Sequence, residues 1–372
     1  MLLEIAEQPQ PAGWQPQATL VVGRKLERRM LKMGVDAMMN GVPEQLDVPV
    51  PVLGSVAVRP SLDAPQVKLK SSKACDGCVR ADVEWAGTLD VGKGKRNKSL
   101  PWTADTVTTL AFVTTDRNGA QVVELRPQPD GPQGVRVDVP ALPPLYDSVV
   151  NGAMSHELRR QLDEGALSEP LQVLSLPPES GVKVRDLAVK ARRGVELDLA
   201  FVTLHSGTVA SVPDPGDGWA AVIPADTLLG LVHANAVQQE MVKGYAAEPT
   251  SLTIEDGRFE MGLKLWKAAK KPKYREYIVR GTVALQQGRL QFAADSAQSV
   301  GGGFFGDPMG AFVNAKLLEA MNEGASVALP GRQTLKLGDQ KLVVRMDRVV
   351  ADDDMVLVYG SVRKPGNGER DR

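Results

Sequence analysis

Two stretches of the chain begin with the same pattern of apolar and polar positions. Residues 13–35 read GWQPQATLVVGRKLERRMLKMGV, and residues 213–238 read PDPGDGWAAVIPADTLLGLVHANAVQ. In both, a turn-rich segment leads into a short apolar run that predicts a strand. Apolar residues at three- and four-residue spacing then predict a helix. The chain therefore starts the same order of elements twice.

Between these two starts, alternating apolar and polar residues predict antiparallel strands separated by Gly, Pro, Asn and Asp. The strand-like runs are SVAVRPSLDAPQVKLK, ADVEWAGTLDV, TVTTLAFVTTD, AQVVELRPQ and VRVDVPA, and DRNG between two of them predicts a hairpin turn. A helix is expected from about Leu145, because apolar residues recur on one face as far as Leu162. The half closes with an alternating hairpin, VKVRDLAVKARRGVELDLAFVT, which turns at Arg193 and Gly194.

The second half repeats this order. A strand at Trp219–Ile223 leads into a helix from Ala225, and SLTIEDGRFEMGLKLW and REYIVRGTVALQQGRLQFAAD then alternate as strands. A glycine run, GGGFFGDP, precedes a second helix with a broad apolar stripe. The half ends in the hairpin QKLVVRMDRVVADDDMVLVYGSV. This hairpin matches the one that closes the first half in length, period and turn position, although few residues are identical.

The repeated order predicts a duplicated unit. We expect a first repeat over residues 14–205, a linker over 206–216, a second repeat over 217–364 and a disordered tail over 365–372. Each repeat has two long amphipathic helices and one sheet with a single apolar face, which must be covered. The predicted fold class is therefore α+β, with two tandem repeats, each a curved antiparallel sheet wrapped around long amphipathic helices.

Composition adds limits to this picture. The 372 residues suit two domains, the hydrophobic fraction of 43% supports a sizeable core, and the net charge of −1 provides no overall field for nucleic acid. The first twenty residues lack the features of a secretory signal, and no window is apolar enough for a membrane span. The sequence as written predicts a cytoplasmic protein, or a periplasmic or secreted one if its start is trimmed.

The two cysteines, Cys75 and Cys78, lie in KACDGCVR between two strand-like runs. This pattern is typical of a hairpin tip. A zinc site needs four ligands, and no second cysteine pair or histidine cluster provides the others. A thioredoxin-like motif would open a helix after a strand, and this motif does not. We expect a structural thiol pair or a local disulfide, and the alternative is redox catalysis.

The order of elements resembles the tubular lipid-binding superfamily, which includes bactericidal permeability-increasing protein and the cholesteryl ester transfer protein. The resemblance covers Gly13 to about Val362 and rests on element order and duplication rather than on a signature motif. It implies two units head to head in an elongated body, each with an apolar groove between helix and sheet that holds acyl chains. Two features depart from the family: this chain shows no secretory signal, and Cys75 and Cys78 are too close in sequence for the long-range disulfide of several members.

Apolar helix residues are the candidates for the walls of such grooves. Each buried methylene of a ligand contributes about 0.8 kcal/mol, so a sixteen-carbon chain would contribute on the order of 10 kcal/mol before entropy costs. Methionine suits such a wall because its side chain adapts to varied shapes. The alternative is that these residues form an ordinary core. The candidate groove residues are Leu26, Met30, Met33, Val149, Met154, Leu158, Leu228, Val232, Phe305, Met309, Phe312 and Leu317.

Two basic clusters occupy equivalent places in the two repeats, each between two strands. They lie in DVGKGKRNKSLPW and LWKAAKKPKYREY. Basic residues beside Trp and Tyr suit an anionic membrane surface, where each cation contributes around 1 kcal/mol. The alternative is a solvated hairpin tip that protects a sheet edge. The candidate membrane-contact residues are Lys95, Arg96, Trp102, Trp266, Lys270, Lys271 and Lys273.

No motif indicates an enzyme. The three histidines are scattered, SHELRRQ lacks the second histidine of a zinc protease, and GGGFFGDPMGAF lacks the order and the lysine of a phosphate-binding loop. The acidic run at residues 352–354 is expected to be a solvated turn. We therefore expect no enzymatic activity, no cofactor and no metal site.

The function that the sequence favours is binding of the acyl chains of a lipid or similar amphiphile in the apolar grooves, for carriage or sensing at a membrane surface. The alternative is a non-enzymatic protein-interaction or structural scaffold of the same fold with closed grooves. The expected partners are a lipid or other amphiphile and, peripherally, an anionic membrane, but not nucleic acid. A carrier needs a groove that is open or filled by ligand, whereas a scaffold would close the same surfaces into a dry core.

Overall fold

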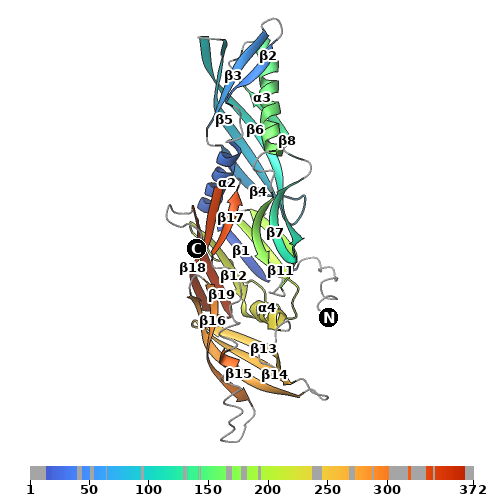
Figure 1. The fold of residues 1–372 in the computed structure, drawn as a ribbon, viewed down its shortest axis with the longest axis vertical. Helices are drawn as coiled ribbons and strands as arrows, with labels where there is room; N and C mark the ends of the chain where they lie inside the picture. The colour runs from blue at the N-terminus through green and yellow to red at the C-terminus, as the bar shows by residue number, and fades with distance from the viewer. Residues whose placement is uncertain are drawn as a thin grey trace.

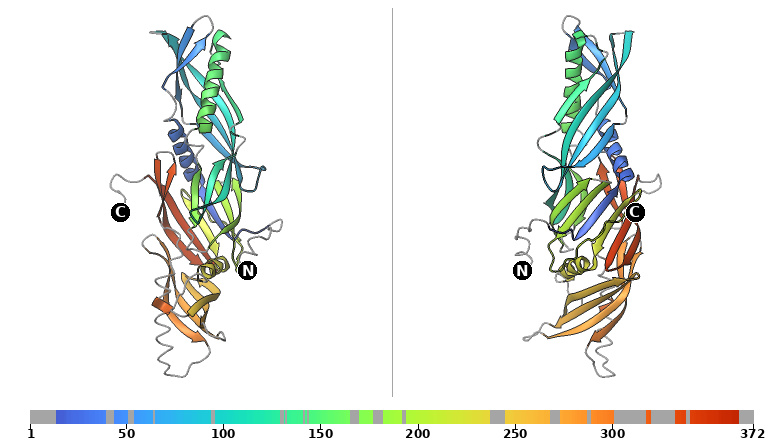
Figure 2. Two further views of the ribbon diagram at one scale, coloured as in Figure 1. Left: turned by 45° about the vertical axis from the view of Figure 1, so that its right-hand side comes forward. Right: turned by 180° about the vertical axis from the view of Figure 1, so that it is seen from behind.

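The molecule is elongated and mostly β, with three antiparallel sheets arranged one after another along its long axis (Figures 1 and 2). Among the residues that the structure describes, no helix has the length and hydropathy that a membrane span requires. The computed structural model describes residues 14–39, 44–50, 54–63, 65–93, 96–128, 131, 133–140, 142, 144–164, 170–176, 182–191, 194–236, 245–267, 273–286, 289–300, 317–319, 332–337 and 340–364.

The central sheet has seven strands in the order β10-β11-β1-β12-β19-β18-β17. The first strand of each predicted repeat lies in the middle, and each pairs on its outer side with the last strand of the same repeat. This is the arrangement that a duplicated unit would produce, although the repeat boundaries remain a prediction. The strands are β1 (Ala18–Gly23), β10 (Val184–Ala191), β11 (Gly194–Phe201), β12 (Trp219–Pro224), β17 (Arg332–Leu337), β18 (Gln340–Asp352) and β19 (Met355–Arg363).

A buried polar group joins three strands of the central sheet. The Asp198 carboxylate of β11 accepts a hydrogen bond from the Thr19 hydroxyl of β1 at 2.7 Å. Its other oxygen pairs with the Lys190 ammonium of β10, also at 2.7 Å, and this bond raises the pKa of Lys190. A buried carboxylate is costly unless it is paired and hydrogen-bonded, so the two partners are what allow Asp198 to lie inside the sheet.

The upper sheet has eight strands and curls strongly. Its main path is β2-β3-β5-β6-β7-β9, with β4 paired to β5 and β8 paired to β6. The DRNG turn forms as expected, because Asn118 and Gly119 have the positive φ values, 52° and 83°, of a tight hairpin. The strands are β2 (Leu46–Val50), β3 (Gly54–Leu62), β4 (Gln66–Ser71), β5 (Cys78–Lys93), β6 (Arg96–Arg117), β7 (Ala120–Pro127), β8 (Gln133–Asp138) and β9 (Leu171–Leu176).

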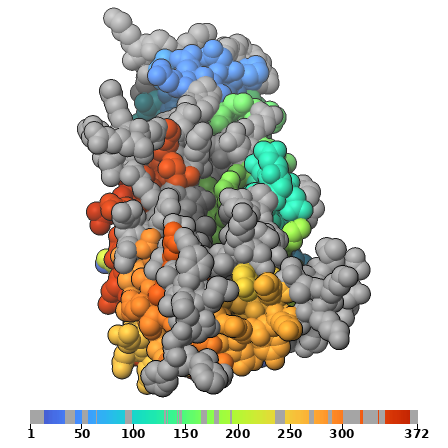
Figure 3. Space-filling view, turned by 60° about the horizontal axis from the view of Figure 1, so that its bottom comes forward, coloured from blue at the N-terminus to red at the C-terminus, as the bar shows by residue number. Residues whose placement is uncertain are grey.

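The lower sheet is a four-stranded meander in which alternate residues are buried. It forms the near end of the molecule in Figure 3, beside the strands that end the central sheet. Asp256 and Gly257 make its first turn with positive φ, as the sequence predicts. The strands are β13 (Tyr245–Glu255), β14 (Arg258–Lys267), β15 (Lys273–Gln286) and β16 (Arg289–Val300).

The helices are α2 (Arg24–Met39), α3 (Pro144–Glu164) and α4 (Ala225–Ala236), with lengths of 16, 21 and 12 residues. They begin where the sequence predicts; α2 and α3 both lie in the first predicted repeat, and α4 lies in the second. Only residues 317–319 of the helix expected after the glycine run are described, and they are helical. The described part of the chain is therefore mostly β, with few helices.

The acidic turn at residues 352–354 forms hydrogen bonds to two other segments. It is therefore not the simple solvated tip that the sequence predicts. Asp354 donates its N–H to the Ile254 carbonyl and accepts the Ile254 N–H on its carboxylate, both at 2.9 Å. Its own carbonyl accepts the N–H of Ala225, the first residue of α4, at 2.7 Å. The turn thereby attaches the lower sheet and α4 to the central sheet, because its exposed carboxylates satisfy backbone donors that another segment presents.

Candidate functional site

The upper sheet and α3 together enclose an apolar interior. At this level the strand order is β2-β3-β5-β6-β8, and α3 lies closest to β2 and β8, the strands on the two sides. The helix runs along the length of the curled sheet (Figure 2). The helix α3 therefore covers the open side of the curled sheet. The inward-pointing side chains of β3, β5 and β6 lie between the helix and the strands.

The inner face of this sheet is apolar, and its few polar atoms are satisfied. Trp85 and Trp102 are both buried on it. The Trp85 indole donates to the Thr106 hydroxyl at 2.9 Å, and the Trp102 indole donates to the Ser61 carbonyl at 3.0 Å. An apolar ligand would consequently meet no unpaired indole N–H at these two positions.

Trp102 was expected at a membrane-contact tip, and that prediction is wrong. The side chain is 3% exposed and points into the upper sheet. Leu100, Trp102 and Ala104 are all buried while the residues between them are exposed, so Trp102 belongs to the inward row of β6. The period of two along the strand, and not the neighbouring basic residues, determines where the indole points.

The apolar face of α3 is only half covered. Val150 and Met154 are buried, with exposures of 0% and 5%. Val149 and Leu158 are partly buried against the same cluster, as are Tyr146, Ala153 and Leu162. Several apolar side chains of the sheet that pack against the same cluster are also only partly buried: Leu46, Leu62, Val67, Leu69 and Val91. Among the described residues, the apolar face of α3 is therefore buried at its centre and partly exposed on both sides.

The other candidate groove residues lie in two separate places. Leu26, Met30 and Met33 of α2 form a small cluster with side chains of β18 and β19. Leu228, Val232 and Leu317 belong to the large core that extends through the central and lower sheets. Phe305, Met309 and Phe312 lie outside the described residues. The structure thus divides the predicted set into three groups and does not form a single surface from it.

The candidate membrane contacts of the second basic cluster are partly described. Lys273 is exposed at the start of β15. Trp266 is half-buried, donates its indole N–H to the Glu248 carboxylate at 2.5 Å and stacks on the exposed Tyr274 ring with centroids 4.7 Å apart. Lys95, Lys270 and Lys271 lie outside the described residues, as does the side chain of Arg96. The membrane interpretation of these residues remains a prediction.

A surface cavity of about 360 Å³ lies away from α3, at the junction of the upper and central sheets. The expected local disulfide joins Cys75 and Cys78 at its rim. Sequence reasoning identified the cysteine pair but not the cavity, because β6 and β10 meet there only after the two sheets dock. Its lining residues are Cys75, Gly77, Phe112, Val113, Thr114, Arg185, Asp186 and Leu187.

Two histidines that the sequence left scattered are neighbours. The His205 and His233 rings lie 5.9 Å apart, edge to face, and His233 is buried in α4. Burial lowers the pKa of His233, nearby His205 lowers it further, and Glu248 opposes the shift. In the part of the chain that the structure describes, no group of three or more His, Cys, Asp or Glu residues could hold a metal ion.

Comparison with known proteins identifies similar solved structures but no sequence family. No protein-family model matches the chain, and no curated protein sequence matches it. The chain is similar to the crystal structure of lipopolysaccharide binding protein, with a TM-score of 0.37 and 10% identity over 95% of this chain and 100% of that chain. It is also similar to P47 from Clostridium botulinum A2, with a TM-score of 0.38 and 9% identity over 93% of this chain and 97% of that chain. Both matches are matches of structure at low sequence identity.

Proposed function

We propose that this protein binds an acyl chain of a lipid or similar amphiphile between α3 and the curled upper sheet. The observation that supports this function is the half-covered apolar face of α3 over a sheet interior whose indole donors are satisfied. The partly buried apolar side chains on this face keep contact with water that a bound acyl chain would remove.

The energetics of this arrangement are favourable for an acyl chain. About ten methylenes buried between helix and sheet would contribute on the order of 8 kcal/mol before entropy costs. Partly buried apolar side chains on both walls would lose their remaining contact with water at the same time. A polar ligand would gain less, because the inner face offers few unpaired hydrogen-bonding groups.

Carriage or sensing would also require contact with a membrane. We propose that the exposed basic and aromatic end of the lower sheet, which includes Lys273 and Tyr274, makes this contact peripherally. Tyr274 is 48% exposed, and the Lys264 ammonium lies 5.1 Å from its ring centroid. Charge reversal at Lys270, Lys271 and Lys273 should weaken sedimentation with anionic vesicles, and unchanged sedimentation would remove this part of the proposal.

The test of the binding site begins with the protein purified under native conditions. Organic extraction and mass spectrometry would identify co-purified molecules, and uptake of a fluorescent fatty acid by extracted, refolded protein would measure the site. We expect a stoichiometric lipid or fatty acid, or saturable uptake. An empty extract together with no uptake would contradict the proposal and favour the alternative of a scaffold with closed grooves.

A matched pair of variants on α3 locates the site. Leu158→Glu places a carboxylate on the half-buried face, and we expect uptake to fall at least about tenfold because a charge would have to be buried beside the ligand. His156→Glu places the same group on the exposed face of the same helix and should leave uptake unchanged. Equal effects of the two substitutions would show that the ligand lies elsewhere.

A further inference from the structure

The loop that carries the disulfide is held in place by its backbone. It joins β4 to β5, and its Asp76 carbonyl accepts the N–H of Val189, in β10 of the central sheet, at 2.7 Å. The Gly77 carbonyl accepts the Phe112 N–H of β6 at 2.8 Å. A Cβ at Gly77 would lie 2.6 Å from the Leu187 side chain, so the loop packs directly against the cavity wall. These bonds do not depend on the sulfur–sulfur bond, and the two sulfurs would stay close if it were reduced.

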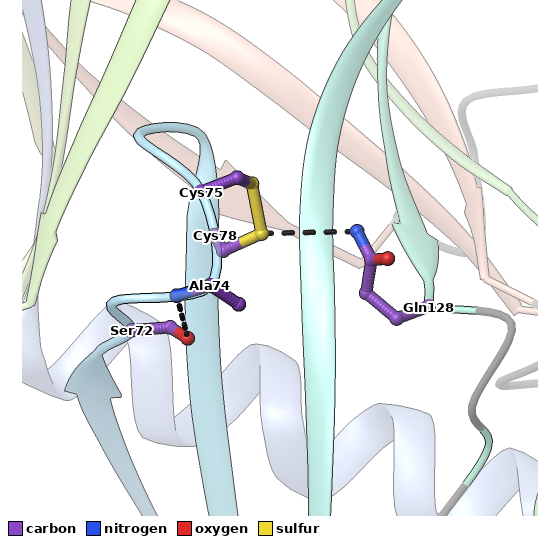
Figure 4. Close-up of a disulfide and its surroundings, with 5 residues drawn as sticks. All are labelled: Ser72, Ala74, Cys75, Cys78 and Gln128. Atoms are coloured by element: carbon purple, nitrogen blue, oxygen red, sulfur yellow. Dashed lines mark hydrogen bonds between the residues drawn. A yellow bond between two sulfur atoms is a disulfide. The ribbon is translucent and has the colours of Figure 1, made fainter.

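The two sulfurs have different surroundings. Cys75 is exposed and lines the cavity, whereas Cys78 is 1% exposed. Gln128 directly follows β7, and its side-chain amide donates a hydrogen bond to the Cys78 sulfur at 3.7 Å (Figure 4). An incoming thiolate can therefore reach Cys75 far more easily than Cys78, and the sulfur that would leave already has a hydrogen-bond donor.

Two strand edges face the cavity. Pairing of β6 with β5 ends at Ala111, so beyond this residue β6 has an edge on the side of the disulfide loop. β10 is the last strand of the central sheet, and other segments bond its outer edge at Val184, Val189 and Ala191. Gln121 bonds both backbone groups of Val184, and Asp76 accepts from Val189. Because alternate residues of a strand point their N–H groups to the same side, Leu187, between these positions, presents its N–H toward the cavity.

We propose that Cys75 and Cys78 form a thiol–disulfide exchange site whose substrate is a cysteine in an extended peptide segment. The cavity places an accessible sulfur beside the edges of β6 and β10, and a strand edge binds extended peptide through backbone hydrogen bonds. Arg185 and Asp186, which pair at 3.5 Å, line the same cavity and together add no net charge to it. This site is separate from α3 and does not depend on lipid binding.

The exchange proceeds in two balanced steps. The peptide thiolate attacks the Cys75 sulfur, a peptide–Cys75 disulfide forms, and the Cys75–Cys78 bond breaks with its electron pair on Cys78. The Cys78 thiolate then accepts the Gln128 hydrogen bond and takes up a proton from water. A second thiolate of the same substrate attacks the peptide sulfur of the mixed disulfide and releases Cys75 as thiolate. The substrate dithiol is thereby oxidised by two electrons and the cysteine pair is reduced.

Single-cysteine variants of the full chain test which sulfur reacts. We would mix Cys78→Ser or Cys75→Ser with a six-residue peptide of alternating valine and threonine, whose central cysteine carries a thiopyridyl group, and follow release of thiopyridone. We expect the Cys78→Ser protein to react at least about tenfold faster, because it retains the accessible sulfur. If a variant does not fold, timed alkylation of the reduced wild-type protein gives the same comparison, with Cys75 labelled first. Equal rates, or faster reaction of Cys78, would overturn the proposal.

A second peptide tests the substrate class. The same peptide with proline on both sides of the cysteine lacks two backbone donors and cannot complete a strand ladder. We expect it to react with the Cys78→Ser protein about tenfold more slowly than the alternating peptide. Equal rates for the two peptides would contradict recognition of an extended segment.

Substitution of Gln128 tests its role at the leaving sulfur. In the protein with both cysteines, Gln128→Leu should slow reduction by the unmodified peptide thiol about threefold to tenfold, since one hydrogen bond to the leaving thiolate is lost. Gln133→Leu removes an exposed amide from β8 and should have no effect. A disulfide that peptide thiol reduces only after the protein unfolds would overturn the proposal, whatever the result of the lipid experiments.

Discussion

The helices α3 and α4 lie against different sheets, and they are buried to different degrees. In α4, every described side chain from Thr227 to Leu231 is buried, and Leu228 has no exposed surface. In α3, buried, half-buried and exposed positions follow one another, and most of its apolar side chains are only half-buried. The two helices would be read in the same way from their apolar spacing. The difference in burial shows that α4 is a core helix, whereas α3 lies at the surface of its sheet.

The space around one glycine in each helix shows the same difference in packing. A Cβ at Gly230 of α4 would lie 2.3 Å from the His205 carbonyl oxygen and 2.8 Å from the Thr203 Cβ. A Cβ at Gly152 of α3 would have no neighbour within 4 Å. The backbone of α4 is therefore pressed against the preceding segment, whereas α3 has open space on its outer side.

The largest effect is expected for Leu228→Ala. The side chain is completely buried, so its truncation should lower the free energy of unfolding by about 2–5 kcal/mol through lost burial and the cavity that remains. Urea unfolding followed by circular dichroism measures it. Leu158→Ala on the half-buried face of α3 provides the comparison and should cost clearly less. Equal losses would mean that α3 is packed as tightly as α4.

Gly230→Ala should have the next largest effect. The added methyl group cannot fit between α4 and the His205 carbonyl without movement of backbone, and we expect a loss of about 1–3 kcal/mol in the free energy of unfolding. The same urea titration applies. An unchanged or increased stability would show that the segment around Thr203 and His205 yields easily, and the contrast with α3 would weaken.

Gly152→Ala should act in the opposite direction. Alanine is favoured over glycine inside a helix, and nothing obstructs the new methyl group, so stability should rise by about 0.5–1 kcal/mol. Fatty-acid uptake should not change, because Gly152 is exposed. A loss of uptake would indicate that the ligand site reaches the outer face of the helix.

The smallest expected effect is a dependence of stability on pH that belongs to α4. Burial lowers the pKa of His233 below its ordinary value near 6.5, so in this range the unfolded chain binds a proton more readily than the folded protein. The contribution of His233 to the free energy of unfolding should be fully present above about pH 6.5. It should be lost as the pH decreases toward the lowered pKa of His233. Thermal unfolding at pH 7.5 and 5.5 checks this.

Two substitutions identify the source of this dependence. His233→Gln should flatten the part of the slope that the buried imidazole contributes. His156→Gln on the exposed face of α3 should leave the slope as it is. If the two substitutions changed the slope equally, the dependence would not arise from burial in α4.

Much of the local structure could be predicted from the sequence. The turns at Asn118 and Asp256 formed where Asn-Gly and Asp-Gly stand, because these residues tolerate positive φ. The position of Trp102 was also available, since the alternation from Leu100 to Ala104 assigns it to the inward row of β6. The lysines near Trp102 do not set its direction, because the period of the strand does.

The candidate sites required contacts between distant segments. Spacing along α3 and α4 could not distinguish a half-covered helix from a buried one, because the difference depends on which strands lie opposite. The connecting role of the acidic turn depends on its hydrogen bonds to Ile254 and to the start of α4, which are distant in sequence. The cavity beside Cys75 exists because β6, beyond the end of its pairing with β5, lies beside the outer edge of β10.

By itself, the sequence determined the strands, the tight turns and the starts of the three helices, because backbone sterics and apolar periodicity act over a few residues. Only the tertiary structure decided which helix face stayed half covered, which sulfur stayed accessible and which strand edges stayed open. These properties depend on burial, and burial is set by surfaces that are brought together from hundreds of residues apart.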